Sequence, residues 1–370
     1  MLPYLEVFFG NPSSVHSAGR DARAAIDNAR DQLAKLLGVK PHELIFTSGG
    51  TEANNLAVLG LAHSQSSRGR HLISAKTEHH AVLNALEHLE EHEDFKVTWL
   101  TVSRTGLVDL DELRDAIRSD TVLVSIMTAN NETGVIQPLR EISEICRNKG
   151  VLFHSDMVQA FGKTATDLDL VDAASFAAHK FYGPKGAGVL YLRAGVPIQP
   201  ILFGGAHENQ RRPGTENVSA IAGMAAAAEW TLRGSDQEKE REGQLRDKLA
   251  IAIDNDYRHA EQNGSLANRL SNTLNVSFPE FDSETLLMAL DLEGVCASSG
   301  SACMVGSVVA SHVLLAMGLP LENARSAVRF SLGRMTTAQE IEETGNAIGR
   351  VIDRLAATKK SSSDSNYAAA

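Results

Sequence analysis

Lys180 stands at a point where a lysine amine could act as a nucleophile. The apolar run at 173–178 ends just before it, and a turn rich in glycine and proline at 183–186 leads into a second apolar run at 187–192. This pattern predicts that Lys180 lies at the end of a strand and faces a cleft, where partial loss of hydration lowers the pKa of the amine. A surface lysine in a turn would produce the same pattern.

Asp156 supplies a second group at the end of a predicted strand, because it follows the apolar run at 151–155. A lysine that forms an imine and an aspartate that pairs with a protonated pyridine nitrogen are the groups on which a pyridoxal phosphate site depends. The presence of both residues favours such a site over the interpretation of Lys180 as a surface residue.

Cys303 lies in a loop of small residues, Ser-Ser-Gly-Ser-Ala at 298–302. Small neighbours are typical of an accessible thiol, whereas Cys146 stands among isoleucines and has the surroundings of a structural cysteine. Cys303 is therefore the candidate nucleophile.

Arg329 is a charged residue inside the alternating segment 326–331. A buried arginine needs an anion, and a substrate carboxylate would serve.

Several polar turns follow predicted strands, where sites in parallel sheets collect. Gly50 and Thr51 open a helical pattern and could bind a phosphate, although a glycine turn before a helix is common without a ligand. Asn131 lies in an Asn-Asn-Glu-Thr-Gly segment, which indicates either a site or a simple polar turn. His79 begins a helix, and its imidazole could stack on an aromatic ligand or belong to a helix cap.

Apolar runs and helical patterns alternate along the chain. We expect strands at 43–47, 71–75, 96–101, 121–127, 151–155, 173–178 and 187–192, and helices at 18–37, 51–63, 79–92, 109–118 and 138–149. This alternation predicts an α/β fold with a largely parallel sheet covered on both faces. The pattern is helical from 218 to 254, and the elements after it fall at 273–278, 283–292, 295–298, 308–317, 326–331 and 337–356.

Length and composition define the class of protein. The 370 residues exceed the size of one ordinary core, so we predict a large domain at 1–235, a small domain at 236–357 and a disordered tail at 358–370. The net charge of −11 disfavours nucleic acid and anionic membranes as partners. We find no metal-binding pattern, membrane span or signal peptide, and three unpatterned cysteines favour the reducing cytoplasm.

With these residues assembled, the chain resembles the group I cysteine desulfurases of the nitrogen-fixation and iron-sulfur-cluster assembly type, within the class V aminotransferase family. The similarity runs from Phe9-Gly10-Asn11-Pro12-Ser13-Ser14 to about residue 355, with motifs in the family order. It implies the type I fold of pyridoxal phosphate-dependent transferases: a large domain with a mostly parallel seven-stranded sheet, and a smaller α+β C-terminal domain that carries the loop of Cys303.

The resemblance also implies an activity and the roles of single residues. The enzyme would remove sulfur from L-cysteine, leave L-alanine and a persulfide on Cys303, and pass the sulfur to an acceptor or iron-sulfur scaffold protein. Lys180 would form the imine with pyridoxal 5'-phosphate and act as base, Asp156 would pair with the pyridine nitrogen, and Arg329 would bind the substrate carboxylate.

Further positions match residues that contact the cofactor in the family: His79 stacked on the ring, Gln159 at the ring hydroxyl, Asn131 at the cofactor or substrate, Gly50, Thr51 and His179 at the phosphate, and Thr215 at the phosphate of the other subunit. The match at Thr215 implies a homodimer.

The sequence departs from the family pattern at three places. Ala177 replaces a serine or threonine, the segment 304–310 is more apolar than usual, and the initial strand with an Asn-Ala-Thr-Thr segment is missing, as if the chain were truncated. Two other hypotheses therefore stay open. A selenocysteine lyase would share every cofactor residue, and a catalytically impaired subunit would bind a cluster-assembly partner without releasing alanine.

Overall fold

The computed structural model describes residues 1–300 and 310–367, which form two compact units. Unit 1 comprises residues 1–102, 107–131 and 136–235. Unit 2 comprises residues 103–106 and 132–135 and the chain from 236 onward. The limits of the two domains and the disorder of the tail, as the sequence suggests them, stay predictions.

Unit 1 is built on a seven-stranded sheet with the order β1-β7-β6-β5-β4-β2-β3. Its strands are β1 (Leu44–Thr47), β2 (His71–Ala75), β3 (Lys96–Leu100), β4 (Thr121–Ser125), β5 (Leu152–Asp156), β6 (Ala173–Ala177) and β7 (Gly188–Leu192). Strands β2 to β6 run parallel, while β7 is antiparallel to both of its neighbours. All but β3 and the start of β5 are buried throughout, as apolar runs in a covered parallel sheet should be. The predicted fold class is confirmed.

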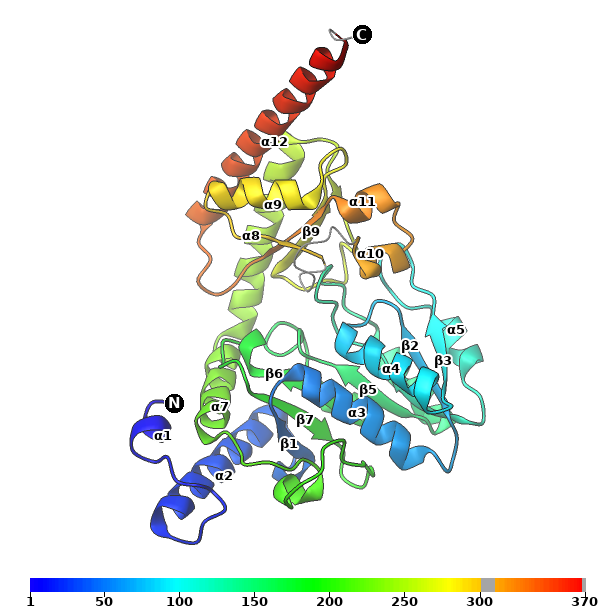
Figure 1. Ribbon diagram of the computed structural model, residues 1–370, viewed down its shortest axis with the longest axis vertical. Helices are drawn as coiled ribbons and strands as arrows, with labels where there is room; N and C mark the ends of the chain where they lie inside the picture. The colour runs from blue at the N-terminus through cyan, green and yellow to red at the C-terminus, as the bar shows by residue number, and fades with distance from the viewer. Residues whose placement is uncertain (301–309, 368–370) are drawn as a thin grey trace. The chain divides into compact units, whose positions relative to one another are not determined.

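The helices of unit 1 connect these strands: α1 (Pro3–Glu6), α2 (Ser17–Leu37), α3 (Gly50–Gln65), α4 (His80–His92), α5 (Leu110–Ala116), α6 (Leu139–Lys149) and α7 (Val218–Leu232). Helix α2 packs against α7, whereas α3 packs against α4 and strands β4 to β7 (Figure 1). The α2 helix begins where His16 accepts a hydrogen bond from the Gly19 N–H and ends at Gly38, whose φ of 70° suits glycine.

Unit 2 contains an antiparallel sheet with the order β10-β11-β9-β8. Its strands are β8 (Glu261–Gln262), β9 (Thr273–Ser277), β10 (Ser298–Ser299) and β11 (Ala327–Ser331), and its helices are α8 (Ser235–Asp256), α9 (Ser283–Leu292), α10 (His312–Ala316), α11 (Leu321–Arg325) and α12 (Ala338–Tyr367). A separate hydrophobic core joins them, with Phe278, Leu290 and Val328 among its buried members.

Two features of the helices differ from the sequence pattern. The helical stretch at 218–254 is divided into α7 and α8, because Gly234 adopts a φ of 72° that interrupts the helix. Helix α12 continues to Tyr367 and so enters the polar segment 358–370. Over the part of the chain that the structure describes, no helix has the length and apolar character needed to cross a membrane.

His154 occupies the interior of the sheet between two serines. Its Nδ1 lies 2.9 Å from the Ser125 hydroxyl and its Nε2 lies 3.0 Å from the Ser175 hydroxyl. Burial lowers the pKa of His154 to about 3. The neutral imidazole is therefore a structural link between β4, β5 and β6.

We expect this histidine to make the protein less stable in acid. Below a pH of about 6.5 the unfolded chain binds a proton that folded His154 does not, so the free energy of unfolding falls by up to about 1.4 kcal/mol per pH unit from 6.5 down toward 3. Urea titrations at pH 7.5, 6 and 5 should give a shallower pH dependence for His154→Asn than for the wild type. Replacing the exposed His88 serves as control, and equal slopes for wild type and His154→Asn would contradict the assignment.

Candidate active site

Four of the predicted residues lie at or just beyond the carboxyl ends of strands of the sheet in unit 1. Asp156 ends β5, Lys180 ends the short 3-10 helix Ala178–Lys180 that follows β6, and Gly50 follows β1. His79 lies beyond β2. Strand β1 runs in the same direction as β6, because both are antiparallel to β7. The topology therefore brings these residues to one edge of the sheet, which is where ligands bind in open α/β sheets.

Asp156 is the electrostatic centre of this edge. Its side chain is buried, with Oδ1 accepting a hydrogen bond from the Val158 N–H at 2.9 Å and Oδ2 accepting one from Asn54 Nδ2 at 2.6 Å. Burial raises the pKa of Asp156, while these hydrogen bonds and the electrostatic effects of His79 and Lys180 oppose that rise. A buried carboxylate surrounded by donors fits a group that brings its own positive charge, such as a protonated ring nitrogen.

Asn54 is a functional candidate that sequence reasoning missed. It is only 1% exposed, lies on α3, and its Oδ1 has no hydrogen-bond partner among the described residues. A signal was available, because Asn54 is a polar residue on a helix face otherwise formed by Ala53, Leu56 and Ala57. Its hydrogen bond orients the Asp156 carboxylate.

Glu78 was also missed as a member of this neighbourhood. It is fully buried, and its Oε1 accepts a hydrogen bond from the Met127 N–H at 2.7 Å. Burial raises the pKa of Glu78 well above its usual value; the Met127 hydrogen bond opposes that effect and the charge of Asp156 adds to it. Glu78 and Asp156 are therefore two buried carboxyl groups whose charges interact.

The turn between β1 and α3 is closely packed. A Cβ atom on Gly50 would lie 2.8 Å from the Val158 side chain and 3.3 Å from Ala177. A Cβ atom on Gly188 would lie 2.6 Å from the backbone of Gly49. Only glycine permits these approaches, and they fix the first N–H groups of α3, which can bind a phosphate.

The other predicted residues of unit 1 differ in environment. The His79 ring itself caps α4, since Nδ1 accepts a hydrogen bond from the Ala81 N–H at 3.1 Å. Gln159 accepts a hydrogen bond from Lys163 at 3.0 Å, Asn131 is half-buried, and Thr51, His179 and Thr215 are exposed. Burial, followed by the charges of Lys180 and Lys185, lowers the pKa of His179.

Lys180 lies just beyond the sheet. The short 3-10 helix Ala178–Lys180 carries it past the buried end of β6, and the residue is exposed on the single chain. The loss of hydration at its amine therefore stays a prediction. Its charge nevertheless acts on Asp156, so the two predicted groups do lie in one neighbourhood.

Unit 2 holds Arg329 in strand β11, half-buried. Burial lowers the pKa of Arg329, and the charge of Glu132 opposes that effect. Glu132 is itself buried and accepts a hydrogen bond from the Ser311 hydroxyl at 2.5 Å. The protein therefore supplies an anion near Arg329, which the sequence did not indicate because Glu132 is far from it in the chain.

Of the cysteines, Cys303 lies outside the described residues. Cys146 is fully buried, and burial together with the charge of Asp172 raises the pKa of its thiol to about 12. A thiol with this pKa is protonated at neutral pH and is a poor nucleophile. Among the described residues, no group of three or more histidine, cysteine, aspartate or glutamate side chains could hold a metal ion.

Comparison with known proteins shows the family of this chain. Residues 1–344 match the model of the family described as aminotransferase class-V. The chain is 46% identical to "Cysteine desulfurase IscS" of Dictyoglomus turgidum over 96% of this chain and 90% of that protein, and 43% identical to the protein of that name from Methanosarcina thermophila over 96% and 88%. A solved structure titled "NIFS-LIKE PROTEIN" superposes with a TM-score of 0.89 at 38% identity, covering 95% of this chain and 94% of the other. This chain belongs to the class-V aminotransferase family.

Proposed function

We propose that the protein is a pyridoxal 5'-phosphate-dependent cysteine desulfurase, which converts L-cysteine to L-alanine and passes the sulfur on for the synthesis of iron-sulfur clusters or other sulfur compounds. The buried Asp156 carboxylate at the end of β5, which accepts hydrogen bonds from Asn54 and Val158 and lies in one electrostatic neighbourhood with Lys180, is the observation that carries this proposal. Relatives named cysteine desulfurase that match 96% of the chain support the same reaction.

The residues at the sheet edge fit the proposed cofactor. Asp156 would pair with its ring nitrogen, His79 would stack on the ring, and Lys180 would bind its aldehyde carbon. Its other contacts would come from Gln159 and Asn131 at the ring and substrate, and from Gly50, Thr51 and His179 at the phosphate. When bound, the cofactor supplies an electron sink for the bonds at the substrate α-carbon.

The chain's own groups would then carry the reaction. Arg329 would bind the substrate carboxylate, and Lys180 would take the proton from the α-carbon. The Cys303 thiolate would attack the substrate sulfur, so that an S–S bond forms as the bond between sulfur and the β-carbon breaks. The electron pair of the broken bond stays with the product carbon, which takes up a proton and leaves as alanine, while Cys303 keeps the sulfur as a persulfide.

We further propose a cytoplasmic homodimer. Thr215 is exposed on the single chain, as a residue that reaches the phosphate of another subunit must be before assembly. Large apolar side chains of unit 1 are exposed as well, among them Phe9 at 75%, Val15 at 89% and Phe203 at 91%. Apolar surface of this kind is typical of a protein interface.

The test is a comparison of Cys303→Ser with the wild type. We expect the variant to bind pyridoxal phosphate normally but to form no persulfide, with alanine release falling by at least about 10³-fold, because the nucleophile is lost. Cys146→Ala is the matched control and should keep both activities. Persistent persulfide formation by Cys303→Ser would remove Cys303 from this role.

The same assay separates the alternative hypotheses. A wild-type protein that releases alanine from neither L-cysteine nor selenocysteine would be the impaired binding subunit, and the proposed activity would be wrong. A protein that turns over selenocysteine but not cysteine, with or without Cys303, would be a selenocysteine lyase.

A further inference from the structure

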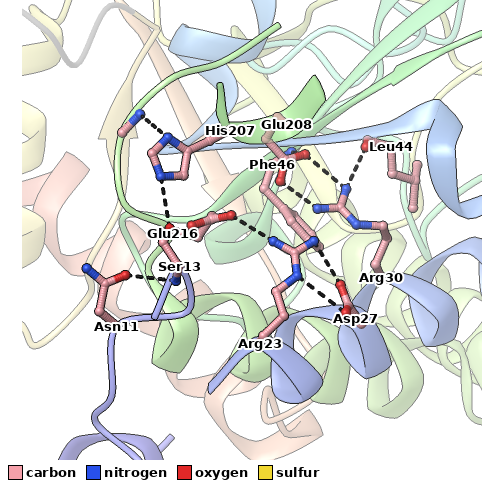
Figure 2. A network of polar contacts seen from close by, with 11 residues as sticks. Asn11, Ser13, Arg23, Asp27, Arg30, Leu44, Phe46, His207, Glu208 and Glu216 are labelled. Atoms are coloured by element: carbon pink, nitrogen blue, oxygen red, sulfur yellow. Dashed lines mark hydrogen bonds and ion pairs between the residues drawn. The ribbon is translucent and has the colours of Figure 1, made fainter. Parts of the chain in front are cut away.

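The segment that carries Thr215 is anchored by charged side chains. We call residues 203–217 the arm. At its base, the Glu208 carboxylate accepts hydrogen bonds from Arg30 at 2.5 and 2.9 Å and from the Phe46 N–H at 3.1 Å (Figure 2). Arg30 also donates to the Leu44 carbonyl at 2.7 Å. The base of the arm is therefore fixed to α2 and β1.

The backbone at the base adopts a conformation that needs this support. Glu208, Asn209 and Gln210 all have positive φ, at 46°, 56° and 63°. Consecutive left-handed residues other than glycine are unfavourable and persist only where the surrounding contacts hold them, most often at functional sites. The ion pair of the buried Glu208 with Arg30 supplies such contacts, so the base of the arm is fixed against α2 and β1 by the protein itself.

A second anchor lies nearer to Thr215. Arg212 donates a hydrogen bond from Nε to Glu52 Oε1 at 2.7 Å and another from Nη2 to Glu52 Oε2 at 3.2 Å. Glu52 Oε2 also accepts a hydrogen bond from the Ser48 N–H at 2.7 Å. One carboxylate thus holds both the arm and the turn between β1 and α3.

Helix capping accounts for only half of this arrangement. Glu52 is the third residue of α3, and a glutamate there commonly accepts a hydrogen bond from the backbone just before the helix. Capping does not require Arg212, which donates to both oxygens of the Glu52 carboxylate. Although burial opposes it, the hydrogen bonds from Arg212 and Ser48 hold the pKa of Glu52 below its usual value, so the carboxylate is charged at neutral pH.

We propose that Glu52 is a positioning residue that couples the turn at the cofactor phosphate site to the arm that carries Thr215. This inference rests on the proposed function, because it takes the turn at Ser48–Thr51 as the phosphate site. In the proposed homodimer the arm of one subunit serves the phosphate of the other. Glu52 would then connect the phosphate turn of its own site to the residue that completes its partner's site.

The test measures cofactor binding to the cofactor-free protein. Pyridoxal 5'-phosphate and pyridoxal, which lacks the phosphate, are titrated against the wild type, Glu52→Gln, Arg212→Gln and the double variant, and dissociation constants are read from the absorbance of the bound cofactor. We expect Glu52→Gln to weaken binding of the phosphate form about tenfold, the effect of losing a charge-assisted hydrogen bond, and to leave pyridoxal binding unchanged.

Arg212→Gln separates coupling from capping, since it leaves Glu52 able to accept from Ser48. We expect it to weaken binding of the phosphate form as well, and the double variant to lose less than the sum of the two single losses. Asp120→Asn is the matched control, because it breaks an exposed aspartate pair with Arg118 at 2.7 and 2.8 Å. It should change neither constant.

The outcomes also separate this inference from the proposed function. The coupling does not exist if the wild type binds pyridoxal phosphate and Glu52→Gln binds it equally well. The same holds if Glu52→Gln weakens the binding of pyridoxal as much as that of pyridoxal phosphate. In both cases the proposed function stands. If the losses of the two single variants add up in the double variant, or if Arg212→Gln binds pyridoxal phosphate normally, then Glu52 acts only as a helix cap. A wild type that does not bind pyridoxal phosphate overturns the proposed function itself.

Discussion

Lys180→Ala is expected to lower the rate of alanine release from L-cysteine by about 10⁴-fold or more, because in the proposed mechanism the variant lacks both the amine that binds the cofactor and the base that moves the α-proton. The initial rate of alanine formation measures this effect under saturating pyridoxal phosphate. Reduction with borohydride should fix the cofactor to the peptide that contains Lys180 in the wild type and to no peptide in the variant.

Lys149→Ala is a suitable control for that experiment, because it removes an exposed lysine from the last turn of α6. It should retain the wild-type rate and the label on Lys180. Alanine release by Lys180→Ala at a rate close to that of the wild type would mean that another base does the work.

Asp156→Asn is expected to lower the rate by about 10²–10³-fold, the cost of leaving one member of a buried charge pair without its partner. Asparagine keeps the size of the side chain but has no negative charge. Its amide would also meet a second amide at Asn54, whose Nδ2 now donates to the carboxylate at 2.6 Å. The rate constant at saturating cysteine and cofactor, together with the absorption spectrum of the bound cofactor, measures the effect.

The control for Asp156→Asn is Asp172→Asn, since Asp172 likewise accepts a backbone hydrogen bond, from the Phe153 N–H at 2.9 Å, and lies beside the same strand. Both variants should lose stability, but only Asp156→Asn should lose rate after correction for the folded fraction. Equal rates for the two would show that Asp156 is a structural carboxylate.

The sheet of unit 1 could be predicted because each strand is a short apolar run that the fold buries on both faces. All seven runs fall within two residues of the observed strands. Strand β8 could not be found in this way, because it is two exposed polar residues, Glu261 and Gln262, paired to β9. The break at Gly234 was missed because the residues on both sides favour helix.

The site was predictable where it depends on chain order and not where it depends on tertiary contacts. Lys180 and Asp156 follow apolar runs, so their position at the sheet edge could be read from the sequence. Asn54 and Glu52 lie inside a helical pattern, and only the fold shows that they hold Asp156 and Arg212. The exposure of Lys180 depends on the turn after β6, which the sequence does not specify.

The pairing of the first strand sets the order in which the protein can assemble. Strand β1 is the outermost strand of the sheet and, among the residues that the structure describes, pairs with β7 alone, with Leu44 opposite Tyr191. Synthesis adds about 5–20 residues each second. Strand β1, which leads into Ser48 and Gly50, can therefore pair with the sheet only after β7 has been synthesised. Such a distant pairing is costly in chain entropy and forms slowly. A nascent chain that stops before residue 188 therefore lacks the strand with which β1 pairs.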